Sequence, residues 1–334
     1  MGKLDRNDLK RLLSCIKPDP KLVAAPKLGF DAGVHKLNSG EYMVVSTDPC
    51  IGVPEPWFGW LLIHYVASDI SLFGAKTQYC TISLLGPKTA KPKVFQNIMQ
   101  QACQAADELG ITVVTGHTGT YNGLTTLVGV CTGYGQIRKD QLVTPAGAQA
   151  GNLVACVKPV GLETVVNFVL THKRLATKLF GAQRVKTLER MVPQQSCVKE
   201  ATILAKTVGV NALHDATEGG VTAALNELAQ ASNVGFRVDL NSFLFPSEVQ
   251  TLREVYALSD LEVLSLSSTG TVLIAVCPDA KDTVESVLRE IGVEVRFVGC
   301  FTNDKKRVLV KNGKETTFPA EPDDPYARLM ENLK

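Results

Sequence analysis

Strand-like and helix-like segments alternate along the whole chain, and this alternation limits the folds that its 334 residues can adopt. Apolar residues repeat at intervals of three and four over residues 95–109 and 221–230, which predicts two amphipathic helices. Short runs rich in β-branched residues, such as residues 42–47 and 153–157, predict strands. The other predicted helices span residues 57–72, 163–170, 194–208 and 282–291, and the other predicted strands span residues 77–84, 111–114, 124–132, 271–276 and 294–298. We therefore expect sheets covered by helices, in an α/β (α+β) fold.

A run of small residues from Pro145 to Gly151 interrupts this pattern near the middle of the chain. Because the chain is longer than a usual single domain, we predict two domains that divide there, over residues 1–146 and residues 147–334. Farther along, the segment from Glu321 to Pro325 is polar and bracketed by prolines, so we expect it to be loosely held.

Charge and hydropathy narrow the range of partners. The formal net charge is +2 and the two signs are interspersed, which argues against nucleic acid as the main partner. No apolar run approaches the length of a membrane span, and the first residues lack the apolar core of a secretory signal, so we expect a cytoplasmic protein without a membrane partner. The nine cysteines form no Cys-x-x-Cys pair and are odd in number, which favours reduced core residues over zinc ligands or disulfides.

The common phosphate-binding signatures are missing from the sequence. No Gly-x-x-x-x-Gly-Lys-Ser/Thr segment occurs, and Gly133-x-Gly135 lacks its third glycine because Arg138 takes that place. No Gly-x-Ser-x-Gly or His-Glu-x-x-His segment occurs, which disfavours the hydrolase and zinc-protease classes. A nucleotide that binds this chain must therefore bind in another way.

The stretch from His214 to Gly220 carries the strongest chemical signal, because two acids and a hydroxyl stand beside paired glycines just before a predicted helix. Carboxylate oxygens are ligands that Mg²⁺ prefers, and free N–H groups at a helix entrance face phosphate. The combination indicates phosphate chemistry centred on Asp215. The open alternative is that Asp215 or Thr217 only caps the helix.

Three further acids, Asp31, Asp48 and Asp69, stand at or near the ends of predicted elements, and Asp69 is one of few charges in a long apolar helix. A carboxylate in such a helix must be hydrogen-bonded, exposed or bound to a metal, because burying it bare is costly. A capping or surface role stays open for each acid. If they converge with Asp215, a divalent cation becomes necessary, because crowded carboxylates otherwise raise one another's pKa.

Five motifs in a fixed order resemble those of the PurM-like superfamily, which includes aminoimidazole ribonucleotide (AIR) synthase, the hydrogenase maturation factor HypE, thiamine-monophosphate kinase and selenophosphate synthetase. The motifs are Gly29-Phe30-Asp31-Ala32-Gly33, Ser46-Thr47-Asp48, Asp69-Ile70-x-x-x-Gly74-Ala75, Thr115-Gly116-His117-Thr118 and His214-Asp215-Ala216-Thr217-Glu218-Gly219-Gly220. They cover nearly the whole chain, and five motifs in order are far more specific than any one of them.

The resemblance implies an N-terminal α/β domain whose sheets pair in a homodimer, with ATP in a cleft near that interface, and a C-terminal α/β sandwich. It implies that Mg²⁺ on the ATP phosphates is held by the acids Asp31, Asp48, Asp69 and Asp215. Nucleotide binding is implied for Asp48, Asp69, His117, Thr118, Gly219 and Gly220, and catalytic roles for Asp215, His214 and Glu218. The metal would neutralise charge on the transferring phosphoryl group, and the glycines would bring backbone N–H groups to it.

HypE is the member that the motifs resemble most, and the sequence departs from it in three ways. HypE reacts through a C-terminal cysteine, whereas the last cysteine here is Cys300, so its self-modification is not carried over. His117 stands where relatives have an acid, and a neutral imidazole is a poor Mg²⁺ ligand, so a phosphate contact or a structural role is open. Glu218 stands where HypE has arginine, which favours extra metal binding, a direct kinase or a helix-dipole contact. His214 either touches substrate or fixes its loop.

These observations favour an ATP- and Mg²⁺-dependent enzyme, HypE-like or AIR synthase-related, that phosphorylates a carbonyl, amide or phosphate oxygen of a small or protein-borne substrate. One alternative is a small-molecule kinase of the thiamine-monophosphate kinase kind. The other is a non-catalytic nucleotide-binding partner in a maturation complex.

Overall fold

A computed structural model of the chain describes Leu4 and residues 6–331. Contacts divide the chain into two compact units. The N-terminal unit contains residues 17–26 and 31–142, and the C-terminal unit contains residues 143–331 with residues 27–30 and the described part of residues 1–16. The main division thus falls between Leu142 and Val143, close to the predicted boundary, while a short early stretch belongs with the C-terminal unit.

The N-terminal unit is built on a six-stranded sheet in the order β1-β2-β3-β6-β4-β5. Neighbouring strands are antiparallel, except that β4 and β5 are parallel. The strands are β1 (Leu22–Ala24), β2 (Gly33–Lys36), β3 (Tyr42–Ile51), β4 (Tyr79–Pro87), β5 (Thr112–Tyr121) and β6 (Val128–Ile137).

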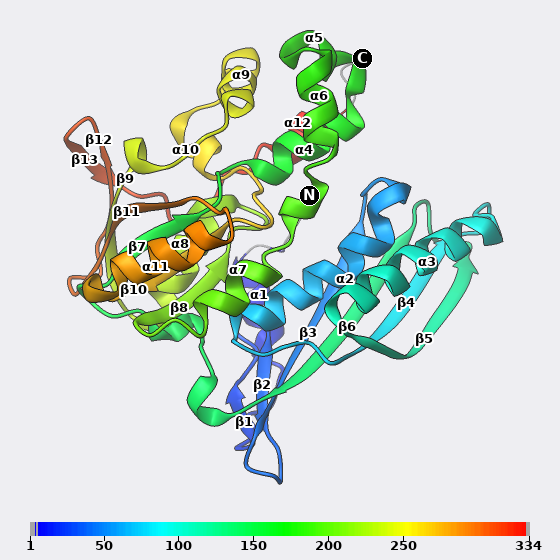
Figure 1. The fold of residues 1–334 in the computed structure, drawn as a ribbon, viewed down its shortest axis with the longest axis horizontal. Coiled ribbons are helices and arrows are strands. Elements are labelled where there is room, and N and C mark those ends of the chain that lie inside the picture. The colour runs from blue at the N-terminus through cyan, green and yellow to red at the C-terminus, as the bar shows by residue number, and fades with distance from the viewer. Residues whose placement is uncertain (1–3, 5, 332–334) are drawn as a thin grey trace. The chain divides into compact units, whose positions relative to one another are not determined.

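Two helices, α2 (Glu55–Leu72) and α3 (Pro92–Leu109), pack together along one face of this sheet (Figure 1). α2 is apolar on nearly all sides, as a helix buried between a sheet and a second helix must be. The two helices touch at Gly59, where an added Cβ would lie 2.1 Å from a backbone carbonyl oxygen of α3. The sheet meets α2 at Gly133, where an added Cβ would lie 2.4 Å from Val66. We call this helix-covered side of the sheet the inner face and the opposite side the outer face.

The C-terminal unit is built on a seven-stranded sheet in the order β13-β12-β9-β11-β7-β10-β8. Neighbouring strands are antiparallel, except that β9 and β12 are parallel. The strands are β7 (Leu153–Val157), β8 (Val210–Asp215), β9 (Gly235–Asp239), β10 (Val272–Val276), β11 (Val295–Thr302), β12 (Arg307–Lys311) and β13 (Lys314–Thr317).

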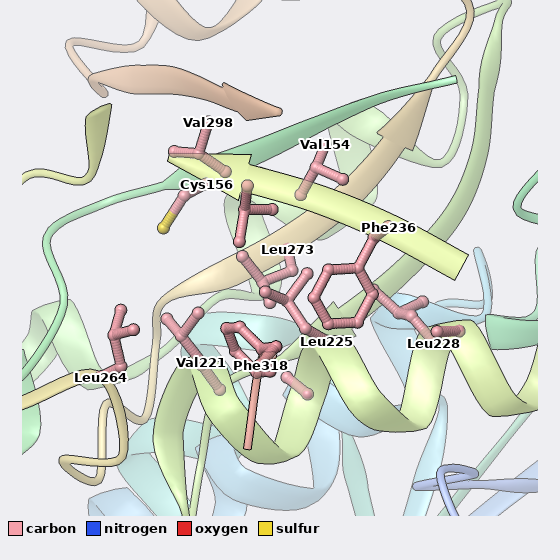
Figure 2. Close-up of a cluster of buried hydrophobic side chains, with 14 of the residues drawn as sticks. Val154, Cys156, Val221, Leu225, Leu228, Phe236, Leu264, Leu273, Val298 and Phe318 are labelled. Carbon is pink, nitrogen blue, oxygen red and sulfur yellow. The ribbon is translucent and has the colours of Figure 1, made fainter. Parts of the chain in front are cut away.

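Helix α8 (Gly220–Ser232) packs against this second sheet. The apolar stripe that the sequence predicts on it is buried, including Val221, Leu225 and Leu228. Figure 2 shows these side chains gathered with Leu273 of β10 in one apolar cluster. The other helices of this unit are α1 (Arg6–Leu13), α4 (Leu162–Thr171), α5 (Lys173–Phe180), α6 (Ala182–Glu189), α7 (Val198–Leu204), α9 (Ser247–Tyr256), α10 (Asp260–Leu264), α11 (Lys281–Glu290) and α12 (Tyr326–Met330).

Most of the predicted elements are confirmed, and one helix is corrected. The predicted strand over residues 153–157 is β7, and the predicted helix over residues 95–109 lies within α3. The helix predicted over residues 194–208 is present but shorter than predicted, because only α7 is α-helical there. Lys158 Nζ donates hydrogen bonds to the carbonyl oxygens of Gln194 (3.1 Å) and Ser196 (2.7 Å), which lie in the 3₁₀ turn Val192–Gln195 and in the extended residue after it, before α7 begins.

The described helices and cysteines can be compared with the predictions about membrane spans and thiols. Among the described residues, no helix combines the length and the apolar character needed to cross a bilayer. All nine cysteines are free thiols, and five of them are buried. The reduced-cysteine interpretation therefore agrees with the structure.

Candidate functional site

Asp69 lies on the side of α2 that faces strand β3. Its Oδ2 accepts a hydrogen bond of 2.6 Å from Ser46 Oγ, a length typical of a hydroxyl bound to a carboxylate. Ser46 is buried and Asp69 is half-buried. The one acid in this apolar stretch of helix is therefore hydrogen-bonded to the sheet, which explains how the fold tolerates it.

Asp48 lies two residues after Ser46 on the same strand. Side chains alternate along a strand, so both residues point to the inner face, as their pairing with Gly133 and Cys131 of β6 confirms. Two residues of a strand span about 6.6 Å, so the structure brings Asp48 into the neighbourhood of Asp69. Burial raises the pKa of the Cys50 thiol, and the negative charge of Asp48 raises it further.

Asp31 stands in the bend before β2 and is half-buried. Among the described residues, the carboxylate oxygens of Asp31, Asp48 and Asp69 do not all lie within 4.8 Å of one another. One cation in direct contact with all three therefore requires side-chain movement.

His117 and Thr118 lie on β5, with their side chains on opposite faces of the sheet. His117 pairs with Ser83 of β4, whose side chain is on the outer face, so His117 is also on the outer face. Three strand spacings of about 4.8 Å put β5 about 14 Å from β3. The structure therefore does not bring His117 together with Asp48 within one chain. Instead, His117 Nε2 lies 2.6 Å from the Tyr121 hydroxyl.

Asp215 is the last residue of β8 and is 3% exposed. The capping alternative is wrong, because the N-cap residue of α8 is Gly219 and Asp215 still pairs with Val272 in the sheet. Among the described residues, Asp215 Oδ1 has no hydrogen-bond partner. A buried carboxylate oxygen without a donor is costly, and an added cation would satisfy it.

His214 is 1% exposed and has an acceptor beside each ring nitrogen. Its Nδ1 lies 2.8 Å from the carbonyl oxygen of Asp215, and its Nε2 lies 3.0 Å from Oε2 of Glu227 on α8. The sequence left open whether His214 touches substrate or fixes its loop. This geometry supports the second role, because the ring lies between the end of β8 and Glu227 on α8.

The paired glycines hold the loop in left-handed backbone conformations, with φ of +79° at Gly219 and +56° at Gly220. An added Cβ at Gly220 would lie 2.4 Å from the carbonyl oxygen of Leu266, so no larger residue fits. Both N–H groups are engaged within the chain: Gly220 donates to the Thr217 carbonyl (2.9 Å), and Gly219 donates to Oδ2 of Asp324 (3.0 Å).

Glu218 is exposed and belongs to a group of interacting acids. Glu163, in the first turn of α4, accepts hydrogen bonds through Oε2 from the backbone N–H (3.1 Å) and the hydroxyl (2.5 Å) of Thr269. Burial raises the pKa of Glu163 to about 7; the Thr269 hydrogen bonds oppose this shift, and the charges of Asp324 and Glu218 add to it. Three carboxyl groups are therefore close enough to repel one another beside the glycine loop.

Three residues with contacts to the predicted site were not predicted from the sequence: Ser46, Glu163 and Asp324. Ser46 was detectable, because it lies two residues before Asp48 and must share its face of the strand. Glu163 and Asp324 are far from the glycine loop in sequence, and nothing in their local patterns indicates the contact. The expectation that residues 321–325 are loosely held is wrong, because Asp324 is bonded to that loop.

Curated relatives of the chain include two kinds of enzyme. Carbamoyl dehydratase HypE of Cupriavidus necator is 27% identical over 297 residues, which cover 84% of this chain and 79% of that protein. A selenide, water dikinase of Haemophilus ducreyi is 27% identical over 316 residues, which cover 84% of this chain and 85% of the dikinase.

Solved structures share the fold of the whole chain. E. coli HypE superposes with a TM-score of 0.74 at 21% identity, and the match covers 97% of this chain and 100% of the HypE chain. HypE in complex with ATP gives a TM-score of 0.68 at 18% identity, covering 95% of this chain and 96% of HypE. A ThiL protein complexed with AMPPCP and TMP gives 0.70 at 16% identity, covering 93% of each chain. At these identities the likeness establishes the two-domain PurM-like architecture.

Two family descriptions match the sequence and together span most of it. The AIR synthase related protein N-terminal domain matches residues 29–135, and the AIR synthase related protein C-terminal domain matches residues 149–312. With both domains present in order, and with the fold of HypE and ThiL, this chain belongs to the AIR synthase-related (PurM-like) family.

Proposed function

We propose that the chain is an ATP- and Mg²⁺-dependent enzyme that phosphorylates a carbonyl, amide or phosphate oxygen of a small or protein-borne substrate. The observation that carries this proposal is that Asp48 lies on the inner face of the N-terminal sheet two residues after Ser46, which donates a hydrogen bond to Asp69 on the covering helix. Carboxylates gathered on one partly buried face fit a cation better than they fit a solvated surface.

The residues present suit Mg²⁺, because every predicted ligand is a carboxylate and none is a thiol or a neutral imidazole. Asp48 and Asp69 would hold the ion, with Asp31 and Asp215 as further ligands. Among the described residues, Asp215 Oδ1 has no hydrogen-bond donor, and such an ion would give this oxygen a positively charged partner. When bound, Mg²⁺ would neutralise negative charge on the transferring phosphoryl group.

The protein residues have separate tasks in this proposal. Ser46 orients Asp69 through its hydrogen bond, and His214 holds the end of β8 against α8 through Glu227. Glu218, exposed at the start of α8, is the acid that faces the acceptor. The acceptor oxygen forms a bond to phosphorus while the bond between phosphorus and the ADP oxygen breaks, so that ADP leaves.

A homodimer through the outer face of the N-terminal sheet is part of the proposal. That face carries exposed aromatic residues: Tyr79 and Tyr121 are 45% and 44% exposed, and Tyr79 lies against Tyr134. His117 shares this face, so it would lie at the interface. Tyr79→Glu should shift the sedimentation coefficient from dimer to monomer, whereas an unchanged dimer would contradict this interface.

A kinase that acts on a small-molecule phosphate is the second candidate, and Glu218 favours it by adding a second acid to the loop. The two candidates differ in their products. A kinase yields ADP and a stable phosphorylated acceptor, whereas activation of a carbonyl or amide followed by dehydration releases inorganic phosphate. Phosphorus NMR of the reaction mixture separates the two.

Phosphate release from ATP tests the proposed site. Turnover should require Mg²⁺ and fall by at least about a hundredfold in Asp48→Asn and Asp69→Asn, as expected for loss of electrostatic stabilisation of a transition state. Asp107→Asn is the matched control, because Asp107 is an exposed acid on α3 of the same unit. Undiminished turnover in both site variants would rule out these acids as the metal ligands.

A further inference from the structure

A cavity of about 260 Å³ opens on the surface of the C-terminal unit, beside helices α9 and α10. Gln250 and Arg253 line it from α9, and because they lie three residues apart they share one face of that helix. Asp260 and Val263 line it in the same way from α10. Lys311, the last residue of β12, also lines the cavity. Three separate elements therefore place side chains around one space.

Two phenylalanine rings give this cavity an apolar wall. Phe243 and Phe245 line it from the loop before α9, and their ring centroids lie 6.4 Å apart. Phe243 is only 6% exposed and belongs to the core of the unit, so this wall is held firmly. An apolar cavity of about 150 Å³ holds benzene. A cavity of about 260 Å³ therefore accommodates one aromatic ring with a short polar group.

The charged side chains of the cavity leave one positive charge unbalanced. Arg253 Nη2 lies 2.5 Å from Asp260 Oδ1, and Lys311 Nζ binds Asp260 Oδ2, so two cations share one carboxylate. In the part of the chain that the structure describes, Asp260 is the one side-chain partner of both cations. A guanidinium has five N–H donors and an ammonium has three, so most of these donors remain for a second acceptor.

We propose that this cavity binds a small monocarboxylate with an aromatic body. The aromatic ring lies against Phe243 and Phe245, where it replaces water on an apolar surface. The carboxylate accepts hydrogen bonds from Arg253 and Lys311, and its single negative charge balances the cavity. A planar carboxylate also matches the paired N–H groups of a guanidinium. None of the lining residues belongs to the candidate functional site, so this inference does not depend on the proposed function.

Benzoate tests the site directly, because it consists of one ring and one carboxylate. In protein labelled with ¹⁵N-phenylalanine, benzoate should shift the amide signals of Phe243 and Phe245. The dissociation constant should be about millimolar, as expected for a ligand with so few non-hydrogen atoms. Benzyl alcohol has the same ring without the charge, and it should bind at least about tenfold more weakly.

Two variants should weaken the binding of benzoate for different reasons. Lys311→Met removes one cation and keeps an unbranched side chain, so the dissociation constant should rise by about tenfold. Gln250→Phe puts a ring into the cavity from an exposed position of α9, so the shifts should disappear. Lys306→Met is the matched control, because Lys306 is an exposed lysine just before β12 that does not line the cavity. This variant should bind benzoate as the wild type does.

Each outcome decides the proposal. Shifts that require the carboxylate and Lys311, and that disappear in Gln250→Phe, support the site. The site is overturned if benzoate leaves the Phe243 and Phe245 signals unchanged, or if benzyl alcohol binds as tightly as benzoate. Equal weakening in Lys311→Met and Lys306→Met would also overturn it, because general attraction to a positive surface would then explain the binding. The measurements need no nucleotide, so a failure of the proposed ATP reaction leaves their result unaffected.

Discussion

Lys158 and Glu200 form a buried ion pair in the C-terminal unit, and we expect that breaking this pair lowers the free energy of unfolding. Lys158 Nζ lies 2.9 Å from Glu200 Oε1, and the two side chains are only 5% and 7% exposed. Nζ also donates to the carbonyl oxygens of Gln194 and Ser196, so all of its donors are used. Lys158→Met would leave the Glu200 carboxylate buried without a cation.

The expected loss is large, because removing one partner of a buried pair costs about 3–5 kcal/mol of the free energy of unfolding. Each kcal/mol shifts the melting temperature of a domain of this size by about 2–4 °C, so the variant should melt about 6–20 °C lower. The double variant Lys158→Met/Glu200→Leu should recover much of this loss, since apolar residues of similar volume often replace such pairs without cost.

Urea unfolding and calorimetry of the two variants measure the effect. The control is Arg296→Met, because Arg296 pairs with Glu294 at 52% and 51% exposure and exposed pairs contribute about 0–1 kcal/mol. The reasoning fails if Lys158→Met costs less than about 1 kcal/mol, or if the double variant is as unstable as the single one.

Two further predictions concern the surroundings of the glycine loop. The pKa of Glu163 is about 7 in the folded protein, against an ordinary 4.5. The protonated side chain therefore stabilises the folded state below about pH 4.5, and this contribution is lost as the pH rises through about 7. Glu163→Gln should therefore gain stability relative to the wild type between about pH 5 and about pH 8, and an equal difference in urea unfolding at both values would refute this. Gly219→Ala combines a φ of +79° with a clash against Pro322 and should cost more than about 1 kcal/mol of unfolding free energy. Gly313→Ala has a similar φ of +76° with nothing within 4 Å, so an equal cost in both variants would show that the contact with Pro322 contributes nothing.

The elements of the fold could be predicted from the sequence wherever hydrophobic period and turn residues agree. In α3 the apolar repeat and Gly110 at φ +67° define the helix together. The prediction failed where a side chain distant in sequence determines the backbone conformation. At residues 194–197, Lys158, which follows β7, binds the backbone carbonyl groups. The length of β5 was also underestimated, since its polar, glycine-containing part is a strand only because it pairs with β4.

The residue types of the candidate site could be predicted from the sequence, but their arrangement in space could be predicted only in part. Asp69 could be selected because it is an acid in an apolar helix, which tolerates none without a partner, and Asp48 because it stands at the end of a predicted strand in one of the five motifs. The hydrogen bond from Ser46 to Asp69 depends on how α2 packs on the sheet, and the position of His117 on the opposite face depends on strand order and register. Strand order cannot be read from local patterns, since it is decided by which strands pair over long separations. The Asp324 contact spans 105 residues and had no local signal.

The most direct test of the central claim is a crystal structure with Mg²⁺ and a non-hydrolysable ATP analogue. We expect the metal bound to the phosphates to contact the carboxylates of Asp48 and Asp69, with Ser46 still bonded to Asp69. A nucleotide whose phosphates and metal lie away from both aspartates would contradict it.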